Sequence, residues 1–226
     1  MAATRILTTH TGSLPRPPEI GEHDLLEGRI YEAVGDVVRK QIECGIDIVN
    51  DGEVGKFSYS GYVKERLSGF SQRGVPRQMK PADTADFPGY AARLEPQLSG
   101  IFMPVCEGPI TYIGLAVVER DCENLRRALK WHDFEGAFLS AASPGVIARF
   151  IENRYYPSHE SHLTALAEAM KTEYDAIHRA GFLLQVDCPE LTGNRDIPGV
   201  APGTDLLGLH SAMVEGARIA SQRLWE

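Results

Sequence analysis

Long apolar runs are missing from this 226-residue sequence, and its first residues lack the extended apolar stretch of a secretory signal. No run approaches the ~20 consecutive apolar residues that a transmembrane helix requires, so no membrane partner is expected. Cysteine is scarce, and the four cysteines form neither a CxxC pair nor a dense framework. This spacing makes a reduced, cytoplasmic location the simplest expectation.

An excess of positive charge is also missing. Lys and Arg number 23 against 31 Asp and Glu, so the formal net charge is −8 and the pI is near 5.4. This balance disfavours phosphate contact, and no nucleic-acid partner is expected, although a local basic pocket for an anionic substrate stays open. A G-x-G-x-x-G motif does not follow the first predicted strand, which weakens a dinucleotide-binding interpretation.

The residues that are present suit one globular domain over 1–226, with 43% hydrophobic and 24% charged residues. Helical apolar stripes alternate with short β-prone runs, a pattern that predicts a parallel sheet covered by helices. Strands are expected at 5–9, 46–49, 102–105, 134–141 and 182–186. Helices are expected at 30–44, 117–131, 161–179 and 206–224, and an irregular excursion at about 71–98.

Polar residues follow each predicted strand at its carboxyl end, where the loops of a barrel or an open α/β sheet converge on the active site. This favours an enzyme over a scaffold, either of the (β/α)8 TIM-barrel type or with an open α/β sheet. About five βα units are recognisable, whereas a closed barrel needs eight, so the predicted barrel is incomplete. A chain with such open sheet edges is expected to form a homo-oligomer, to pair with a partner chain or to adopt a rearranged open sheet.

Three segments carry a family resemblance: TTHTGSLPR at 8–16, GIDIVNDGE at 45–53 and LQVDCP at 184–189. In this order they resemble the C-terminal catalytic domain of cobalamin-independent methionine synthase. They also resemble its shorter single-barrel relatives, such as archaeal methyl-transferring forms and epoxyalkane:coenzyme M transferases. Gly108-Pro109-Ile110-Thr111 looks similar as well. The resemblance covers residues 4 to 191 and implies a barrel of the uroporphyrinogen decarboxylase/methionine synthase type.

This resemblance implies transfer of a methyl or alkyl group to a thiol such as homocysteine, which zinc holds as the nucleophilic thiolate. Glu53 and Asp187 match the carboxylates that bind the amino group of the substrate. Ser13, with the backbone around Gly12, matches the residue that binds the substrate carboxylate. Two carboxylates at the ends of different strands also suit an ammonium group on physical grounds, because each accepts a charge-assisted hydrogen bond.

His10 and Thr11 complete the predicted substrate-binding set. His10 departs from the methionine synthases proper, and it is interpreted either as a ligand-contacting base or as a hydrogen-bonded rim residue. Lys56 either holds an anionic substrate or faces solvent. Cys44 and Cys106 are expected to be buried, small apolar side chains rather than ligands.

The zinc ligands of the family are a His-x-Cys pair, a glutamate on a following strand and a further cysteine. No His-x-Cys occurs in the sequence and no cysteine follows Cys188, so the ligands are expected beyond Glu226 and no metal or catalytic residue is assigned. A substitute set of His10, Glu53, Asp187 and Cys188 suits zinc by residue type, but no spacing requires it. No cobalamin is expected, and a folate, a corrinoid protein or another alkyl source stays open as methyl donor.

Two alternatives remain. The first is a metal-free barrel like the uroporphyrinogen decarboxylases, which bind an acidic substrate through clustered arginines near the first strand; Arg16 lies there, but the pattern is thin. The second is a non-catalytic half-barrel that binds an amino-acid-like ligand or a partner chain.

Overall fold

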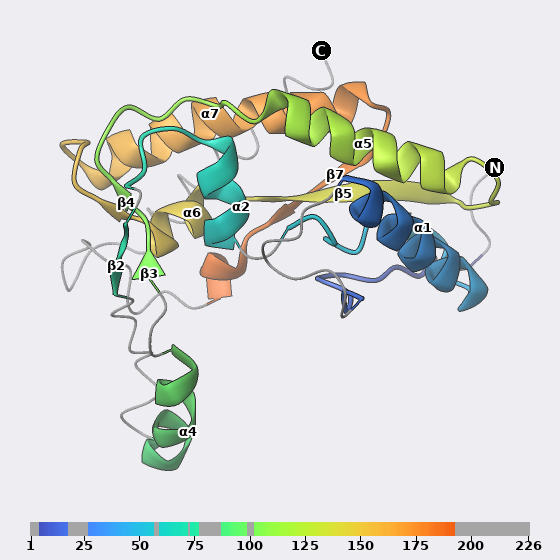
Figure 1. Cartoon of the computed structure of the whole chain (residues 1–226), viewed down its shortest axis with the longest axis horizontal. Helices are drawn as coiled ribbons and strands as arrows, with labels where there is room; N and C mark the ends of the chain where they lie inside the picture. The colour runs from blue at the N-terminus through green and yellow to red at the C-terminus, as the bar shows by residue number, and fades with distance from the viewer. Residues whose placement is uncertain are drawn as a thin grey trace. The chain divides into compact units, whose positions relative to one another are not determined.

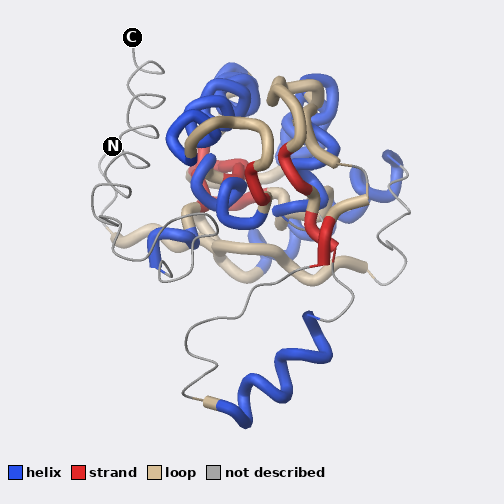
Figure 2. The backbone as a smooth tube through the Cα atoms, turned by 90° about the vertical axis from the view of Figure 1, so that its left-hand side faces the viewer, coloured by secondary structure: helices blue, strands red, loops and turns tan. Residues whose placement is uncertain are grey.

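The computed structural model describes residues 5–17, 27–56, 59–71, 73–76, 87–98 and 102–192. These residues form a mixed α/β fold in which helices make up more of the backbone than strands do, and the strands are short (Figure 2). The chain divides into two compact units, each assembled from separated segments. Unit 1 comprises Met1–Tyr62, Gly114–Ala141 and Thr172–Val186, and unit 2 comprises Val63–Ile113, Ala142–Lys171 and Asp187–Glu226.

The largest sheet has three strands in the order β1-β5-β7. They are β1 (Ile48–Asn50), β5 (Gly136–Ala142) and β7 (Leu183–Asp187). β1 runs parallel to β5, with Ile48 opposite Gly136 and Asn50 opposite Phe138. β5 is buried along nearly its whole length, as expected for an apolar strand that is covered on both faces. The predicted parallel pairing of strands is confirmed.

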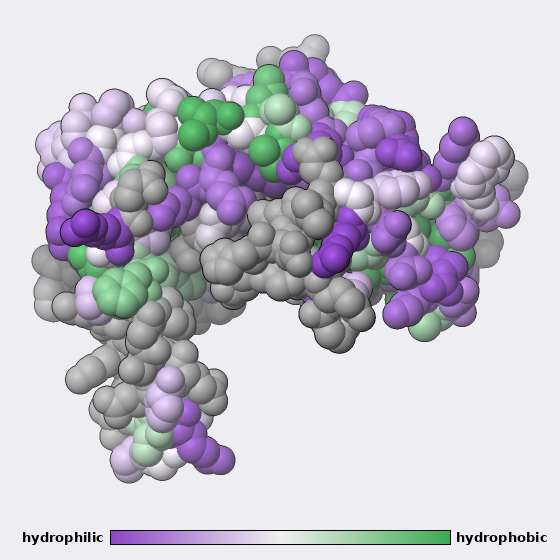
Figure 3. All heavy atoms as spheres, viewed as in Figure 1, coloured by the Kyte–Doolittle hydropathy of each residue, from purple (hydrophilic) through white to green (hydrophobic). Residues whose placement is uncertain are grey.

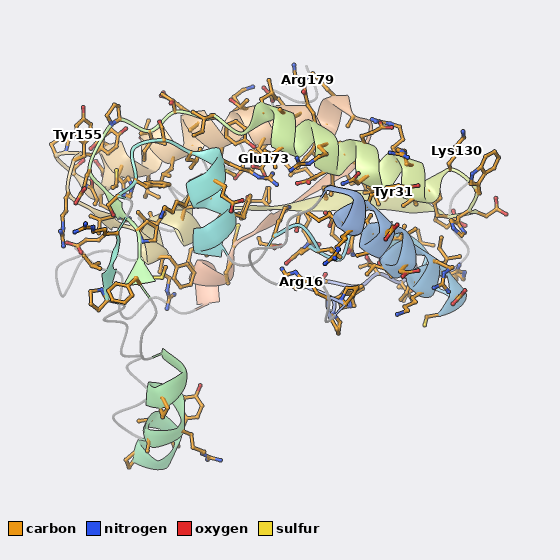
Figure 4. The ribbon with its side chains drawn as sticks, in the orientation of Figure 1. Arg16, Tyr31, Lys130, Tyr155, Glu173 and Arg179 are labelled. Carbon is orange, nitrogen blue, oxygen red and sulfur yellow. The ribbon has the colours of Figure 1, made fainter. Side chains whose placement is uncertain are left out.

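In unit 1, helices α1 (Glu27–Glu43) and α5 (Leu115–Leu129) pack against each other (Figure 1). Their apolar stripes are buried, whereas their outer faces are mostly hydrophilic (Figure 3). Tyr31 of α1 points toward α5 (Figure 4), where its ring lies 4.1 Å from the guanidinium carbon of Arg127. Both helices lie where the periodicity predicts them.

The longest helix, α7 (His159–Arg179), also confirms the apolar face that its sequence predicts. Leu166, Met170, Tyr174 and Ile177 are almost completely buried along it. The helix is followed by Gly181 at φ 86°, a left-handed conformation that glycine adopts at low cost after a helix.

Unit 2 holds two small sheets. β2 (Val75–Pro76) pairs antiparallel with β3 (Phe102–Met103), and β4 (Val105–Cys106) pairs parallel with β6 (Glu152–Asn153). The remaining elements are α4 (Pro88–Leu98), α6 (Pro144–Phe150), the 3-10 helix η1 (Pro189–Thr192), and α2 (Tyr59–Arg66), which crosses from unit 1 into unit 2.

Two sequence predictions in unit 2 are corrected. The strand expected at 102–105 is broken at Pro104, which has no N–H to donate, and its two halves join different sheets. The excursion at 71–98 is not wholly irregular, because it contains β2 and α4. Pro88 stands at the first position of α4, where a proline is tolerated.

The first predicted strand, at 5–9, is reduced to a single parallel bridge between Thr9 and Ile48. The carboxylate of Asp47 takes both the backbone N–H (2.7 Å) and the hydroxyl (2.9 Å) of Thr8. A side chain that binds a backbone donor in this way competes with the ladder of a sheet.

Among the described residues, the strands form three small sheets rather than a continuous barrel wall. The single-domain organisation stays a prediction, and the helix expected at 206–224 lies outside the described residues. No helix in the described part of the chain is long and apolar enough to cross a membrane.

Candidate functional site

The loop after β1 carries a glutamate in an unusual backbone conformation. Glu53 has φ 56° and is the one described non-glycine residue with a positive φ. The carboxylate of Asp51 accepts a hydrogen bond from the Glu53 N–H at 3.0 Å, and the side-chain oxygen of Asn50 accepts one from the Gly52 N–H at 2.7 Å. Local side chains therefore hold the turn in the left-handed region, which is costly for residues other than glycine.

The N-terminal segment of unit 1 holds this loop from the other side. The guanidinium of Arg16 (labelled in Figure 4) donates to the carbonyls of Val54 (3.0 Å), Glu53 (3.3 Å) and Lys56. The Leu14 N–H donates to the Gly52 carbonyl at 3.0 Å. Arg16 thus binds the backbone of the loop. Because its guanidinium is engaged there, the structure disfavours Arg16 as the anion-binding arginine of a decarboxylase-like site.

The carboxylate of Glu53 is held by two hydroxyl groups from different segments. Ser13 donates to Oε2 at 2.5 Å, and Ser140 of β5 donates to Oε1 at 3.0 Å. The structure therefore brings two of the predicted site residues, Ser13 and Glu53, into direct contact. A carboxylate that accepts one hydroxyl proton on each oxygen keeps lone pairs free to accept further donors, such as an ammonium group.

The other residues of the 10–13 segment are His10, Thr11 and Gly12, which directly precede Ser13 in the chain. His10 places Nε2 3.0 Å from the Gly12 carbonyl, and its own carbonyl accepts from the amide of Asn50 at 2.9 Å. Thr11 is exposed, and Gly12 has φ 90°, which suits glycine alone. For His10, these contacts match the hydrogen-bonded alternative of the two sequence interpretations.

One of the two interpretations of Lys56 placed its side chain in solvent, and the structure corrects this. Its side chain is buried, its ammonium donates to the carbonyl of Ser140, and it lies 5.3 Å from the ring centroid of Tyr62. Burial raises the pKa of the neighbouring Asp51 carboxyl, and the charge of Asp121 adds to this, while the positive charge of Lys56 opposes it. Lys56 is therefore a buried part of the loop, not a surface charge.

Asp187 ends β7 and belongs to unit 2. Its carbonyl accepts from the Ser143 N–H at 3.0 Å. The Ser143 hydroxyl donates to the buried carboxylate of Glu190 at 2.7 Å and accepts from the Val146 N–H at 2.9 Å, which caps α6. The turn after Asp187 is thus bonded to the junction between β5 and α6.

Cys106, Cys122 and Cys188 do not present an activated thiolate. Burial raises the pKa of the Cys106 thiol. Burial also raises the pKa of Cys188, and the charge of Glu190 adds to this increase. Burial raises the pKa of Cys122 to about 12. Cys106 is buried as predicted, but Cys44 is exposed, which corrects the expectation of a buried side chain. Cys44 follows the last residue of α1, at the point where the helix leaves the core.

The zinc implied by the family resemblance does not fit the residues described. Among the residues that the structure describes, no group of three or more His, Cys, Asp or Glu side chains is arranged to hold a metal ion. The substitute set of His10, Glu53, Asp187 and Cys188 is accordingly not a ligand cluster. The imidazole Nε2 of His10 already has an internal partner, the Gly12 carbonyl.

Two polar residues of these contacts, Ser140 and Glu190, were given no site role from the sequence. Ser140 lies near the end of a predicted strand, but only the parallel register of β1 and β5 shows that it reaches Glu53. Glu190 is three residues after Asp187 in a segment without periodicity. A signal for both was their place near the carboxyl end of a strand, within β5 for Ser140 and after β7 for Glu190, where site residues gather.

No protein-family model matches the sequence, and no curated protein sequence matches it either. Among solved structures, the chain is similar to a B12-independent methionine synthase from Shewanella sp. W3-18-1 in complex with selenomethionine. The TM-score is 0.58 at 20% identity, over 80% of this chain and 51% of that chain. It is also similar to a Listeria monocytogenes protein assigned as a vitamin-B12 independent methionine synthase. There the TM-score is 0.61 at 18% identity, over 95% of this chain and 63% of that chain.

These comparisons show a fold shared with B12-independent methionine synthases, which agrees with the family-level resemblance seen in the sequence. The chain spans between half and two thirds of the length of the two structures.

Proposed function

We propose that this chain is a methionine synthase-like transferase of the barrel type, whose described residues recognise the amino group of a sulfur-containing amino acid. The observation that carries the proposal is the Glu53 carboxylate. It sits on a backbone of φ 56° after β1, and hydroxyl groups bind both of its oxygens. Strained residues that the surrounding structure holds in place cluster at functional sites.

The structural likeness supports the ligand class, because the Shewanella protein was solved in complex with selenomethionine. Under this proposal Glu53 accepts hydrogen bonds from the ammonium group of the ligand. The segment 10–13 lies along the bound amino acid. What these residues contribute is binding and orientation of the ligand, and no transfer step is assigned to them.

Titration calorimetry with L-methionine and L-selenomethionine tests the proposal. We expect the wild-type chain to bind both, and Glu53→Gln to weaken binding by about 10-fold to 100-fold. This range corresponds to a lost charge-assisted hydrogen bond. Glutamine keeps the shape of the side chain and the strain of the backbone, so the change isolates the charge.

The matched control is Glu32→Gln, which removes the same charge from an exposed position on α1 and should leave binding unchanged. Absence of binding by the wild-type chain, or equal binding by Glu53→Gln, would contradict the proposed function.

A further inference from the structure

The side-chain hydroxyl and the backbone carbonyl of Ser140 both bind side chains of the 51–56 loop. Ser140 is buried in β5, two residues beyond Phe138, which is the partner of the last residue of β1. Its hydroxyl donates to Glu53 Oε1 at 3.0 Å, and its carbonyl accepts from the ammonium of Lys56. The strand next to β1 thus holds the loop at two of its charged side chains, Glu53 and Lys56.

This arrangement matters because a glutamate side chain has several rotatable bonds. Ordering such a side chain on ligand binding costs conformational entropy when it is not already fixed. Ser13 binds the other oxygen, but Ser13 is exposed and lies on a segment that joins the sheet through one bridge. Ser140 is instead buried on a seven-residue strand, where packing limits the movement of a side chain more than at an exposed position.

We propose that Ser140 is a positioning residue that fixes the Glu53 carboxylate in the orientation that accepts the ammonium group of the ligand. The inference rests on the proposed function, since it assigns Ser140 a role only through Glu53. Lys56 supports the same arrangement by binding the Ser140 carbonyl, which keeps this part of β5 against the loop.

A double-mutant cycle read by calorimetry with L-methionine separates positioning from a general structural effect. Ser140→Ala should weaken binding about 5-fold to 10-fold in the wild-type background, the size expected for one lost hydrogen bond. In the Glu53→Gln background the same change should weaken binding less than about 2-fold, because the carboxylate through which Ser140 acts is gone.

Equal losses in the two backgrounds, or no loss in either, overturn the inference while the proposed function stands. Absence of wild-type binding overturns the proposed function itself, which the first titration reveals. Should Ser140→Ala unfold, Ser140→Cys keeps nearly the same shape with a much weaker donor and should give the same pattern. Thr164→Ala, which removes an exposed hydroxyl of α7, is the control and should bind like the wild type.

Discussion

At the scale of single residues, the conformation of Glu53 is the strongest sign that the loop after β1 serves more than packing. A turn of this shape would form more easily with glycine, and the preceding residue, Gly52, is one with φ 64°. A Cβ at Gly52 would lie 2.7 Å from a methyl carbon of Val37, so that position is closed to larger residues. Position 53 nevertheless carries a long acidic side chain, and its oxygens are the groups that the neighbouring hydroxyls bind.

The strain at position 53 leads to a stability prediction. Glu53→Gly and Glu53→Ala both remove the carboxylate, but only glycine adopts φ 56° without steric cost. Glycine should therefore give the more stable variant, by about 1 kcal/mol in the free energy of unfolding, against the usual preference for alanine. Urea denaturation of the two variants measures the difference. If alanine is as stable as glycine, the left-handed conformation is not required there.

At the scale of elements, Ser143 joins α6 to η1. Its hydroxyl caps α6 through the Val146 N–H and donates to the buried carboxylate of Glu190. Ser143→Ala removes the cap, worth 0.5–2 kcal/mol in typical helices, and one hydrogen bond to a charged group, so a loss of about 2–3 kcal/mol is expected. Ser143→Gly should lose less through the cap, because glycine is tolerated at this position.

Chemical denaturation of the two variants checks this order. A loss below about 0.5 kcal/mol in Ser143→Ala would show that neither contact stabilises the fold, since surface changes have effects of that size.

The long helices and the central strands could be predicted from the sequence, because α1, α5 and α7 keep an apolar stripe over three or more turns. β5 and β7 are apolar runs between clear helix ends. Short elements such as α2, α6 and β6 were missed because their ends depend on tertiary contacts. The Ser143 cap, for example, is visible only with its donor. The strand at 5–9 failed because the Asp47 carboxylate takes donors that a ladder would have used.

The candidate site, like the fold, could be predicted from the sequence only in part. That Ser13 and Glu53 lie together could be predicted, because both follow the carboxyl ends of neighbouring parallel segments. That Ser140 bonds to Glu53, and that Lys56 is buried against the Ser140 carbonyl, could not. Both facts depend on how far β5 extends beyond β1.

At the scale of the whole molecule, buried titratable groups make the stability depend on pH. The Arg5 guanidinium, followed by the N–H and hydroxyl of Thr8, holds the pKa of Asp47 well below its usual range. A lowered carboxyl pKa stabilises the fold at pH values above the unfolded pKa of about 3.9, and this contribution is lost as the pH falls further. Between pH 4 and 7, Asp47 therefore changes little.

In that window, His162 of α7 differs in protonation between the folded and the unfolded chain. Its side chain is 1% exposed and its ring stacks on Tyr156 with 5.8 Å between centroids. Neither ring nitrogen has a hydrogen-bond partner in the described part of the chain. Burial, with a smaller effect of the neighbouring His159, lowers the pKa of His162 to about 4. Because the unfolded pKa is about 6.5, the unfolded chain binds one more proton between these values.

The fold should therefore lose stability as the pH falls from 6.5 to 4, and His162 should account for a slope of up to about 1.4 kcal/mol per pH unit. Replacing the imidazole by an apolar group of similar size, His162→Leu, should remove this slope and leave the stability at pH 7.5 within about 1.5 kcal/mol of the wild type. Urea denaturation at a series of pH values measures both. His178→Leu, at the exposed end of the same helix, is the matched control and should keep the slope. Parallel curves for His162→Leu and the wild type would mean that the buried imidazole is not what makes this fold sensitive to acid.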